Sequence, residues 1–242
     1  MKLKPGPTLT EADMKGDFDY RGVVGSLHYL VRGCRPDLAN CVRTLSKFLT
    51  CYDDTHIAAA RRALNYLKQT RNYGLIYNGA AEVKVWFELF TDAAFGSALD
   101  DRRSISGYLI MMANAALSWR SKRQSHVTLS SSEAELVAVS EGVKESEWLY
   151  YLLEELGFRQ TKPIRVKCDN TAAITTVSRP DNHPMTKHIE IRYLYAREIQ
   201  EAGRIQMEYC NTNEMIADAL TKPLPRPKFE YFRGLMGVHD LS

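Results

Sequence analysis

The spacing of hydrophobic residues changes near residue 80 and divides the chain into two patterned parts. Between residues 20 and 70, apolar side chains recur every three or four positions, the period of an amphipathic helix. They predict two helices over 20–49, broken near Pro36 because proline disfavours helix in the residue before it, and a third over 55–70. From residue 83, apolar and polar residues alternate, which is the period of a strand.

The second part mixes strands and helices in a definite order. The predicted strands cover 83–92, 103–112, 115–121, 164–168 and 205–210. The predicted helices cover 132–156, 170–177, 188–202, 213–220 and 228–236. Short connections between the first three strands favour an antiparallel meander. The expected fold class is therefore α/β: a mixed five-stranded sheet, with three antiparallel strands and then two more, flanked by helices and preceded by a small α-helical subdomain.

Composition and charge add limits to this picture. With 45% hydrophobic and 25% charged residues among 242, the chain has the composition of an ordinary globular protein. Its longest apolar run, 109–117, is far shorter than the roughly 20 residues of a membrane helix, so we expect no membrane span. Residues 1–80 carry 12 Lys and Arg against 7 Asp and Glu, and residues 81–242 carry 20 against 22. This asymmetry suits a basic arm beside an acidic body, and is weak support for a nucleic-acid partner.

Four acidic residues stand at the ends of predicted elements or in short helices. They are Asp92 after the first strand, Glu135 near the start of the long helix, Asp169 after the fourth strand, and Asp218 in a late helix. We hypothesise that these four carboxylates converge to hold divalent metal. Acids this close repel one another, and their pKa values rise unless a cation is bound. Oxygen ligands that leave room for water favour Mg²⁺, and Mn²⁺ could replace it.

Each acid also has a simpler interpretation. Ser132 and Glu135 have the spacing of a capping box, in which Glu135 would bond back to the helix start. Asp169 and Asn170 could cap the helix that follows. Asp92 could be a turn residue and Asp218 a solvated helix acid. Their joint appearance in this order favours the metal site. The pair at 53–54, by contrast, is interpreted as a helix cap and not as a polymerase metal site, because an apolar stripe begins directly after it.

Local motifs resemble one known family. FTDA at 90–93, LSSSEAE at 129–135, CDN at 168–170 and ADALTK at 217–222 are similar to the ribonuclease H region of copia-type LTR retrotransposon polyproteins. YRGVVGSLHYL at 20–30 is similar to the helices that follow the polymerase palm in those polyproteins. Residues 1–17 lack periodicity and contain Pro5, Gly6 and Pro7, so they are expected to be a flexible lead-in. The resemblance implies a thumb- or connection-like helical segment over 18–80, a ribonuclease H-like domain over 81–222 and a C-terminal tail with a short helix over 223–242.

The resemblance also implies an activity. The chain would be a metal-dependent endonuclease that cuts the RNA strand of RNA/DNA hybrids, with Asp92, Glu135, Asp169 and Asp218 as catalytic ligands of two Mg²⁺ ions, or of Mn²⁺ in their place. Contacts to the substrate are expected from five further residues: Arg103, Lys122, Arg123, Asn170 and His188. The expected partners are the hybrid and the polymerase portion of the same polyprotein. The palm aspartates have no counterpart here, so no DNA synthesis is expected from this chain alone.

Two other functions are compatible with the sequence. Because the palm is missing and residues such as Ala94 and Phe95 depart from the family pattern, the chain could be a catalytically weak or inactive nucleic-acid-binding remnant of a retroelement. A different nuclease of the same fold, such as an integrase, ranks lower because it would lack the SSEAE context. The resemblance places the protein inside the cell, in cytoplasmic virus-like particles, with the nucleus as a second site.

Overall fold

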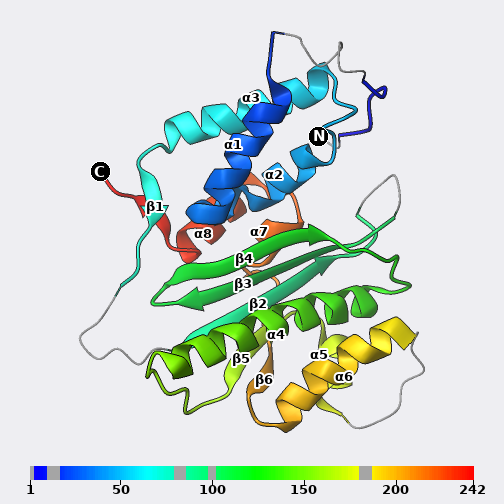
Figure 1. The fold of residues 1–242 in the computed structure, drawn as a ribbon, viewed down its shortest axis with the longest axis vertical. Coiled ribbons are helices and arrows are strands. Elements are labelled where there is room, and N and C mark those ends of the chain that lie inside the picture. Colours follow the sequence, from blue (N-terminus) through cyan, green and yellow to red (C-terminus); the bar gives the residue numbers. More distant parts are fainter. Residues whose placement is uncertain (1–2, 10–16, 79–85, 98–101, 180–186) are drawn as a thin grey trace.

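A five-stranded sheet lies at the centre of the molecule, with helices on both of its faces (Figure 1). The computed structural model describes residues 3–9, 17–78, 86–97, 102–179 and 187–242, without the side chains of 187–193. One face of the sheet is covered by α4 (Ser131–Glu155), against which α6 (Lys187–Glu201) packs. The other face carries α2 (Ala39–Ser46) and α7 (Asp218–Thr221). No helix in the described part of the chain is long and apolar enough to cross a membrane.

The strands follow the order β4-β3-β2-β5-β6 across the sheet. Their bounds are Phe87–Ala94 (β2), Ile105–Met112 (β3), Ala115–Arg123 (β4), Ile164–Cys168 (β5) and Ile205–Tyr209 (β6). The β2–β3 and β3–β4 pairs are antiparallel, whereas β5 runs parallel to β2 and β6 parallel to β5. Three antiparallel strands followed by two parallel ones form the ribonuclease H-like sheet expected from the sequence, and the fold prediction is confirmed.

The element that carries Asp92 differs from its prediction. We expected the first strand of this sheet to end at Asp92, but β2 continues to Ala94 and Asp92 lies inside it, paired with Gly107 of β3. The start expected at 83–85 falls outside the described residues. The continuation is explained by β3, which reaches back to Ile105 and pairs with the two residues beyond Asp92. The residues before and after Asp92 are therefore both paired with β3, and Asp92 is held in a strand and not in a turn.

Most of the remaining helices agree with the expected positions. They are α1 (Tyr20–Gly33), a short 3-10 turn (Pro36–Leu38), α3 (Asp54–Gln69), α5 (Thr171–Ser178) and α8 (Arg226–Leu235). Asp53 caps α3 by accepting hydrogen bonds from the amides of Thr55 and His56, which confirms the cap interpretation of the 53–54 pair. The helix expected at 213–220 is shorter than predicted, since only Asp218–Thr221 is helical.

A second, two-stranded sheet was not predicted. Strand β1 (Tyr73–Leu75) pairs antiparallel with β7 (Val238–Asp240). Strands of three residues are too short to show the alternation on which strand prediction depends. The pairing brings the C-terminal tail back to the end of the N-terminal helical part (Figure 1).

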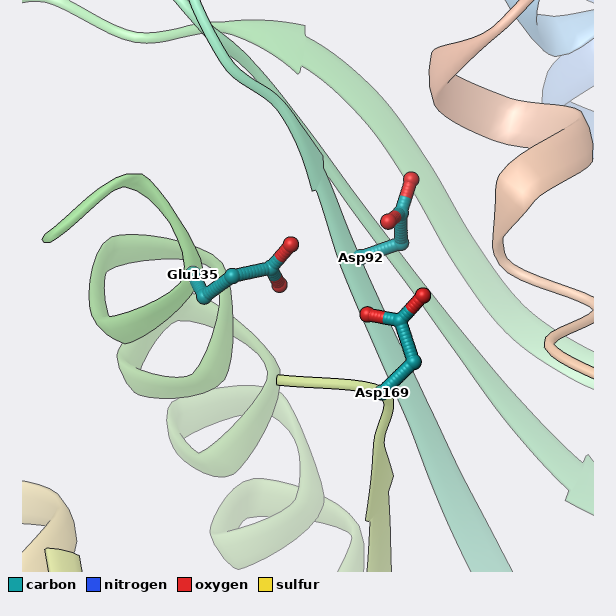
Figure 2. A group of neighbouring side chains, drawn as sticks. All are labelled: Asp92, Glu135 and Asp169. Atoms are coloured by element: carbon teal, nitrogen blue, oxygen red, sulfur yellow. The ribbon is translucent and has the colours of Figure 1, made fainter. Parts of the chain in front are cut away.

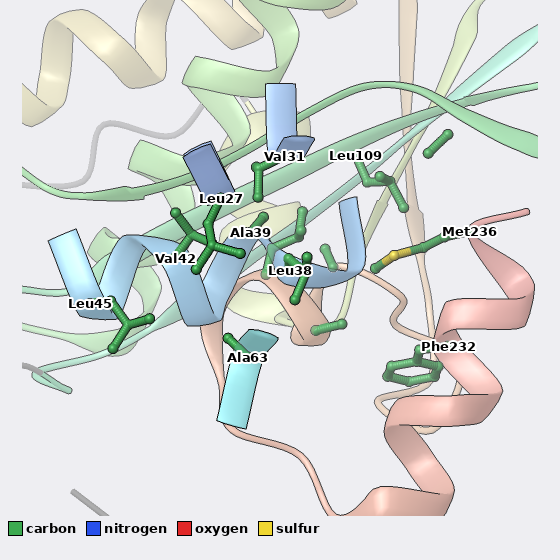
Figure 3. Close-up of a cluster of buried hydrophobic side chains, with 14 of the residues drawn as sticks. Leu27, Val31, Leu38, Ala39, Val42, Leu45, Ala63, Leu109, Phe232 and Met236 are labelled. Atoms are coloured by element: carbon green, nitrogen blue, oxygen red, sulfur yellow. The ribbon is translucent and has the colours of Figure 1, made fainter. Parts of the chain in front are cut away.

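The helical part packs directly on the sheet. Buried side chains of α1 and α2, such as Leu27 and Leu45, share one apolar cluster with Leu109 of β3 and with Phe232 of α8 (Figure 3). The indole Nε1 of Trp119, on β4, donates a hydrogen bond of 2.8 Å to the Val31 carbonyl of α1. This cluster shows that the N-terminal helices contact the α/β body.

A second apolar cluster joins the opposite face of the sheet to α4, through Leu89, Ile110 and Val143 among others. Gly142 allows the close approach of this helix, because a Cβ there would lie 3.0 Å from side-chain atoms of Leu89 and Thr91. This second cluster fixes β2 and α4 relative to each other, and these two elements carry the first two acids of the candidate site.

Candidate metal centre

Three carboxylates meet near the C-terminal ends of the inner strands β2 and β5. One oxygen each of Asp92, Glu135 and Asp169 lies within 4.8 Å of the others (Figure 2). Asp92 and Glu135 are buried and Asp169 is half-buried. The three come from different elements, namely β2, the first turns of α4, and the position directly after β5. Residues far apart in the sequence therefore form one anionic group.

Strand register explains why Asp169 meets Asp92. Strands β2 and β5 are parallel neighbours, and Phe90 is paired with Lys167. Two residues further along each strand, Asp92 and Asp169 are at the same level of the sheet. Asp169 also accepts a hydrogen bond of 3.0 Å from the hydroxyl of Thr212. The cap of α5 is formed by Asn170, whose side chain accepts from the Ala173 amide at 3.0 Å, so Asp169 is not used for capping.

The start of α4 explains how Glu135 is available. The N-cap is Ser130, which accepts from the Glu133 amide at 3.1 Å, and the Glu133 carboxylate in turn accepts from the Leu129 amide at 2.7 Å. The simpler capping interpretation of Ser132 and Glu135 is therefore wrong by two residues, because Ser130 is the N-cap and Glu133, not Glu135, bonds back to an amide just before the helix. Glu135 instead reaches β2 and accepts a hydrogen bond of 3.1 Å from the Ala93 amide.

The electrostatics of this group favour a bound cation. Burial, together with the neighbouring charges of Asp92 and Asp169, raises the pKa of Glu135 to about 9. Burial also raises the pKa of Asp92, against the opposing effect of the Lys222 ammonium. Among the described residues, Glu135 Oε2 is buried without a hydrogen-bond partner. Three hard oxygen donors, one of them unsatisfied, fit a divalent ion such as Mg²⁺ or Mn²⁺.

Lysine side chains occupy the position beside this group where the fourth acid was expected. Lys222 Nζ lies 3.0 Å from Asp92 Oδ1 and 2.8 Å from Asp218 Oδ1. Lys228 Nζ lies 3.0 Å from Asp218 Oδ2, and the Thr221 hydroxyl donates to Asp92 Oδ2. In the part of the chain that the structure describes, Asp218 thus does not belong to the three-carboxylate group, although Lys222 links it to Asp92.

Sequence reasoning missed Lys222. The spacing of four residues from Asp218 was a usable signal, because such pairs face each other on a helix. Its contact with Asp92, 130 residues away, had no signal in the sequence.

Three of the residues predicted to contact substrate lie at one end of the β3–β4 pair, where Ile105 is paired with Arg123 and Ser106 with Lys122. Lys122, on the exposed end of β4, is 3.6 Å from the Glu141 carboxylate. Arg123 is exposed at the last position of β4, and Arg103 is half-buried just before β3. His188 belongs to α6, but its side chain lies outside the described residues. A substrate role for these residues and for Asn170 stays a prediction.

No protein-family model matches the chain. It is 36% identical over 238 residues, 98% of its length, to the "Retrovirus-related Pol polyprotein from transposon RE1" of Arabidopsis thaliana. It is 37% identical over 243 residues, 99% of its length, to the corresponding polyprotein from transposon TNT 1-94 of Nicotiana tabacum.

A solved structure of the N-terminal RNase H domain of rv2228c from Mycobacterium tuberculosis, fused to maltose-binding protein, is 15% identical with a TM-score of 0.43. That comparison covers 62% of this chain and 97% of the other. The family assignment rests on the sequence relatives, of which the chain spans only 16% and 18% of the length. With matches of this identity over nearly its whole length, the chain belongs to the family of retrovirus-related Pol polyproteins of copia-type transposons.

Proposed function

We propose that the chain hydrolyses the RNA strand of RNA/DNA hybrids, as the ribonuclease H part of a retrotransposon reverse transcriptase. The observation that carries this proposal is the group formed by Asp92, Glu135 and Asp169 near the C-terminal ends of the inner strands of a ribonuclease H-like sheet. Membership of the Pol polyprotein family supports it, since such polyproteins contain a reverse transcriptase. The substrate is inferred from the resemblance and the site together.

Asp92, Glu135 and Asp169 would hold the metal, for which Mg²⁺ is the first candidate and Mn²⁺ a substitute. When bound, divalent ions supply an activated water and stabilise the charge on the leaving oxygen of a phosphodiester. Two ions remain our prediction. Asp218 could act as a fourth ligand only if Lys222 and Lys228 release its carboxylate.

The chain's own contribution is to hold its carboxylates in place before any substrate arrives. The Ala93 amide orients Glu135, the hydroxyl of Thr221 orients Asp92, and that of Thr212 orients Asp169. Donors that are already in place need no rearrangement during the reaction, and such preorganisation accounts for a large share of enzymatic rate enhancement. The positive charge of Lys222 also keeps Asp92 closer to its ionised form, which is the form that binds metal.

A cleavage assay tests the proposal. Purified chain with Mg²⁺ should shorten the labelled RNA of a hybrid and leave the DNA strand intact. Asp169→Asn should remove this activity. Asp54→Asn is the matched control, because Asp54 is exposed on α3 and far from the three carboxylates in sequence and fold.

Two results would contradict the assignment: undiminished cleavage by the Asp169→Asn protein, or equal cutting of both strands. Tight binding of hybrid without cleavage, at any concentration of Mg²⁺ or Mn²⁺, would instead favour the inactive remnant.

A further inference from the structure

A cationic cavity lies between the helical part and the edge strand of the sheet, outside the metal centre. Its volume is about 520 Å³, and α1, α2 and β4 form most of its wall. Four of its lining side chains carry a positive charge, namely Arg32, Arg43, Arg120 and Lys122. Glu145 is the single carboxylate among the lining residues, and it accepts a hydrogen bond of 2.8 Å from Ser118.

Arg43 is the least exposed of these four cations, and its hydrogen-bond partners are neutral. Its guanidinium donates to the Ser121 hydroxyl at 3.0 Å, to Asn40 Oδ1 at 2.6 Å and to the Thr44 hydroxyl at 3.1 Å. Among the described residues no carboxylate contacts it. Burial, and then the nearby charge of Arg123, lower the pKa of Arg43 to about 10. A largely buried cation is costly unless an anion pairs with it. Because the partners of Arg43 are all neutral, a bound anion would lower this cost.

The register of the sheet relates the cavity to the metal centre. Asp92 is paired with Gly107, and Gly107 is paired with Ser121, which holds the Arg43 guanidinium. Paired residues on neighbouring strands point to the same face, and adjacent strands lie about 4.8 Å apart. The backbone positions of Asp92 and Ser121 are therefore separated by roughly 10 Å across the sheet. One nucleic-acid strand carries a phosphate every ~3.4 Å of helix axis, so a duplex at the carboxylates places other phosphates at this distance.

We propose that this cavity binds a backbone phosphate of the nucleic acid that is cut at the metal centre. The inference rests on the proposed function and adds a subsite to it. Arg32, Arg120 and Lys122 are exposed at the rim, whereas Arg43 lies deeper, an arrangement that suits a polyanion crossing the edge strand. Guanidinium groups bind phosphate through two parallel N–H donors. Contacts of this kind position a duplex without reading its sequence.

Binding measured without metal separates this subsite from catalysis. The affinity for an RNA/DNA hybrid is determined in EDTA over a series of salt concentrations, for the unmodified chain and for Arg43→Gln, Arg120→Gln and Arg159→Gln. Arg159 is the control, because it is exposed in the loop after α4 and does not line the cavity. We expect Arg43→Gln to weaken binding about tenfold, as for loss of a charged hydrogen bond. Each lost phosphate contact should also reduce the slope of log K against log salt by about one.

Arg43→Lys distinguishes loss of charge from loss of fold. It keeps the positive charge, so it should retain the salt slope of the unmodified chain even if the affinity falls. Thermal unfolding of Arg43→Gln, which also loses hydrogen bonds to Ser121 and Asn40, shows whether the variant is folded at the assay temperature. Arg120→Gln, a substitution at an exposed position, provides the same test without that risk.

The outcomes of the two proposals differ. If Arg43→Gln and Arg120→Gln bind hybrid as tightly as Arg159→Gln and with the same salt slope, the subsite is overturned while RNA cleavage can still stand. Stabilisation by inorganic phosphate without any effect of the variants on hybrid binding would also overturn it, in favour of a small-anion site. Weaker binding by both variants, in a chain that never cleaves RNA, would keep the subsite and remove the nuclease.

Discussion

The protonation of Glu135 gives the most quantitative prediction of the site. Its pKa of about 9 in the folded, metal-free chain lies far above the usual 4.5. Between these two values the unfolded chain has released this proton and the folded chain still holds it. The free energy of unfolding of the metal-free protein should therefore fall as pH rises, by up to about 1.4 kcal/mol per pH unit from this group. From pH 5 to pH 8 the accumulated loss is on the order of 4 kcal/mol.

Glu135→Gln removes this titration and keeps an oxygen that can accept from the Ala93 amide. In EDTA at pH 8 the variant should be more stable than the unmodified chain, and its melting temperature higher by on the order of 10 °C, since 1 kcal/mol shifts Tm by about 2–4 °C at this size. At pH 5 the two should nearly coincide. Differential scanning calorimetry from pH 5 to pH 8.5 measures the difference. Glu155→Gln is the control, because Glu155 is exposed at the end of the same helix.

Added metal should make the unmodified chain more stable than Glu135→Gln at pH 8. Mg²⁺ or Mn²⁺ binds the deprotonated carboxylates and stabilises the folded state by mass action, so its effect on the unmodified chain should grow with pH. Glu135→Gln lacks one ligand and should respond much less. If the metal-free pH profiles of the unmodified chain and Glu135→Gln run parallel, Glu135 is not held protonated by its surroundings and the electrostatic account of the site is wrong.

Three further predictions concern neighbouring residues. Lys222→Met leaves the buried carboxylates of Asp92 and Asp218 without their shared cation, so calorimetry in EDTA should show that the free energy of unfolding falls by about 3–5 kcal/mol. Mn²⁺ should restore more of the lost stability in Lys222→Met than in Lys228→Met, whose lysine contacts only Asp218 of these two acids. Equal recovery in the two variants would count against a metal site at Asp92. Gly107→Ala places a Cβ 2.7 Å from a Thr221 side-chain atom and should cost about 1–3 kcal/mol in urea unfolding; no change would mean that α7 shifts freely. Ser130→Ala removes the cap of α4 and should cost about 0.5–2 kcal/mol with unchanged metal affinity by calorimetric titration; a parallel loss of affinity would show that the cap also positions Glu135.

The fold could be predicted because its signals are local and repeated. Alternation along 164–168 and the three- and four-residue spacing along 132–156 predicted β5 and α4 to within about a residue of their observed ends. The pairing of β1 with β7 could not be predicted in this way. Each strand has three residues, and the two lie at opposite ends of the chain. Their contact depends on tertiary structure that local periodicity does not encode.

The candidate site was predictable in part for the same reason. Glu135 and Asp169 follow from where a helix begins and a strand ends, whereas Asp92 lies inside β2 and not at the strand end that was expected; the structure brings these three together. The environment of Asp218 does not follow from such patterns, because it depends on Lys228 as well as Lys222. The capping box at Ser132 was the alternative interpretation of Glu135, and it was available because three successive serines stand there, each of which is an acceptable N-cap residue.

The location of bound metal tests the central claim most directly. Crystals of the chain grown with Mn²⁺ and measured at the manganese absorption edge would reveal each bound ion by its anomalous signal. We predict a peak bounded by the carboxylates of Asp92, Glu135 and Asp169, with Lys222 displaced from Asp92. Anomalous peaks found only elsewhere, or none at saturating Mn²⁺, would contradict the proposal that these three residues form a catalytic metal centre.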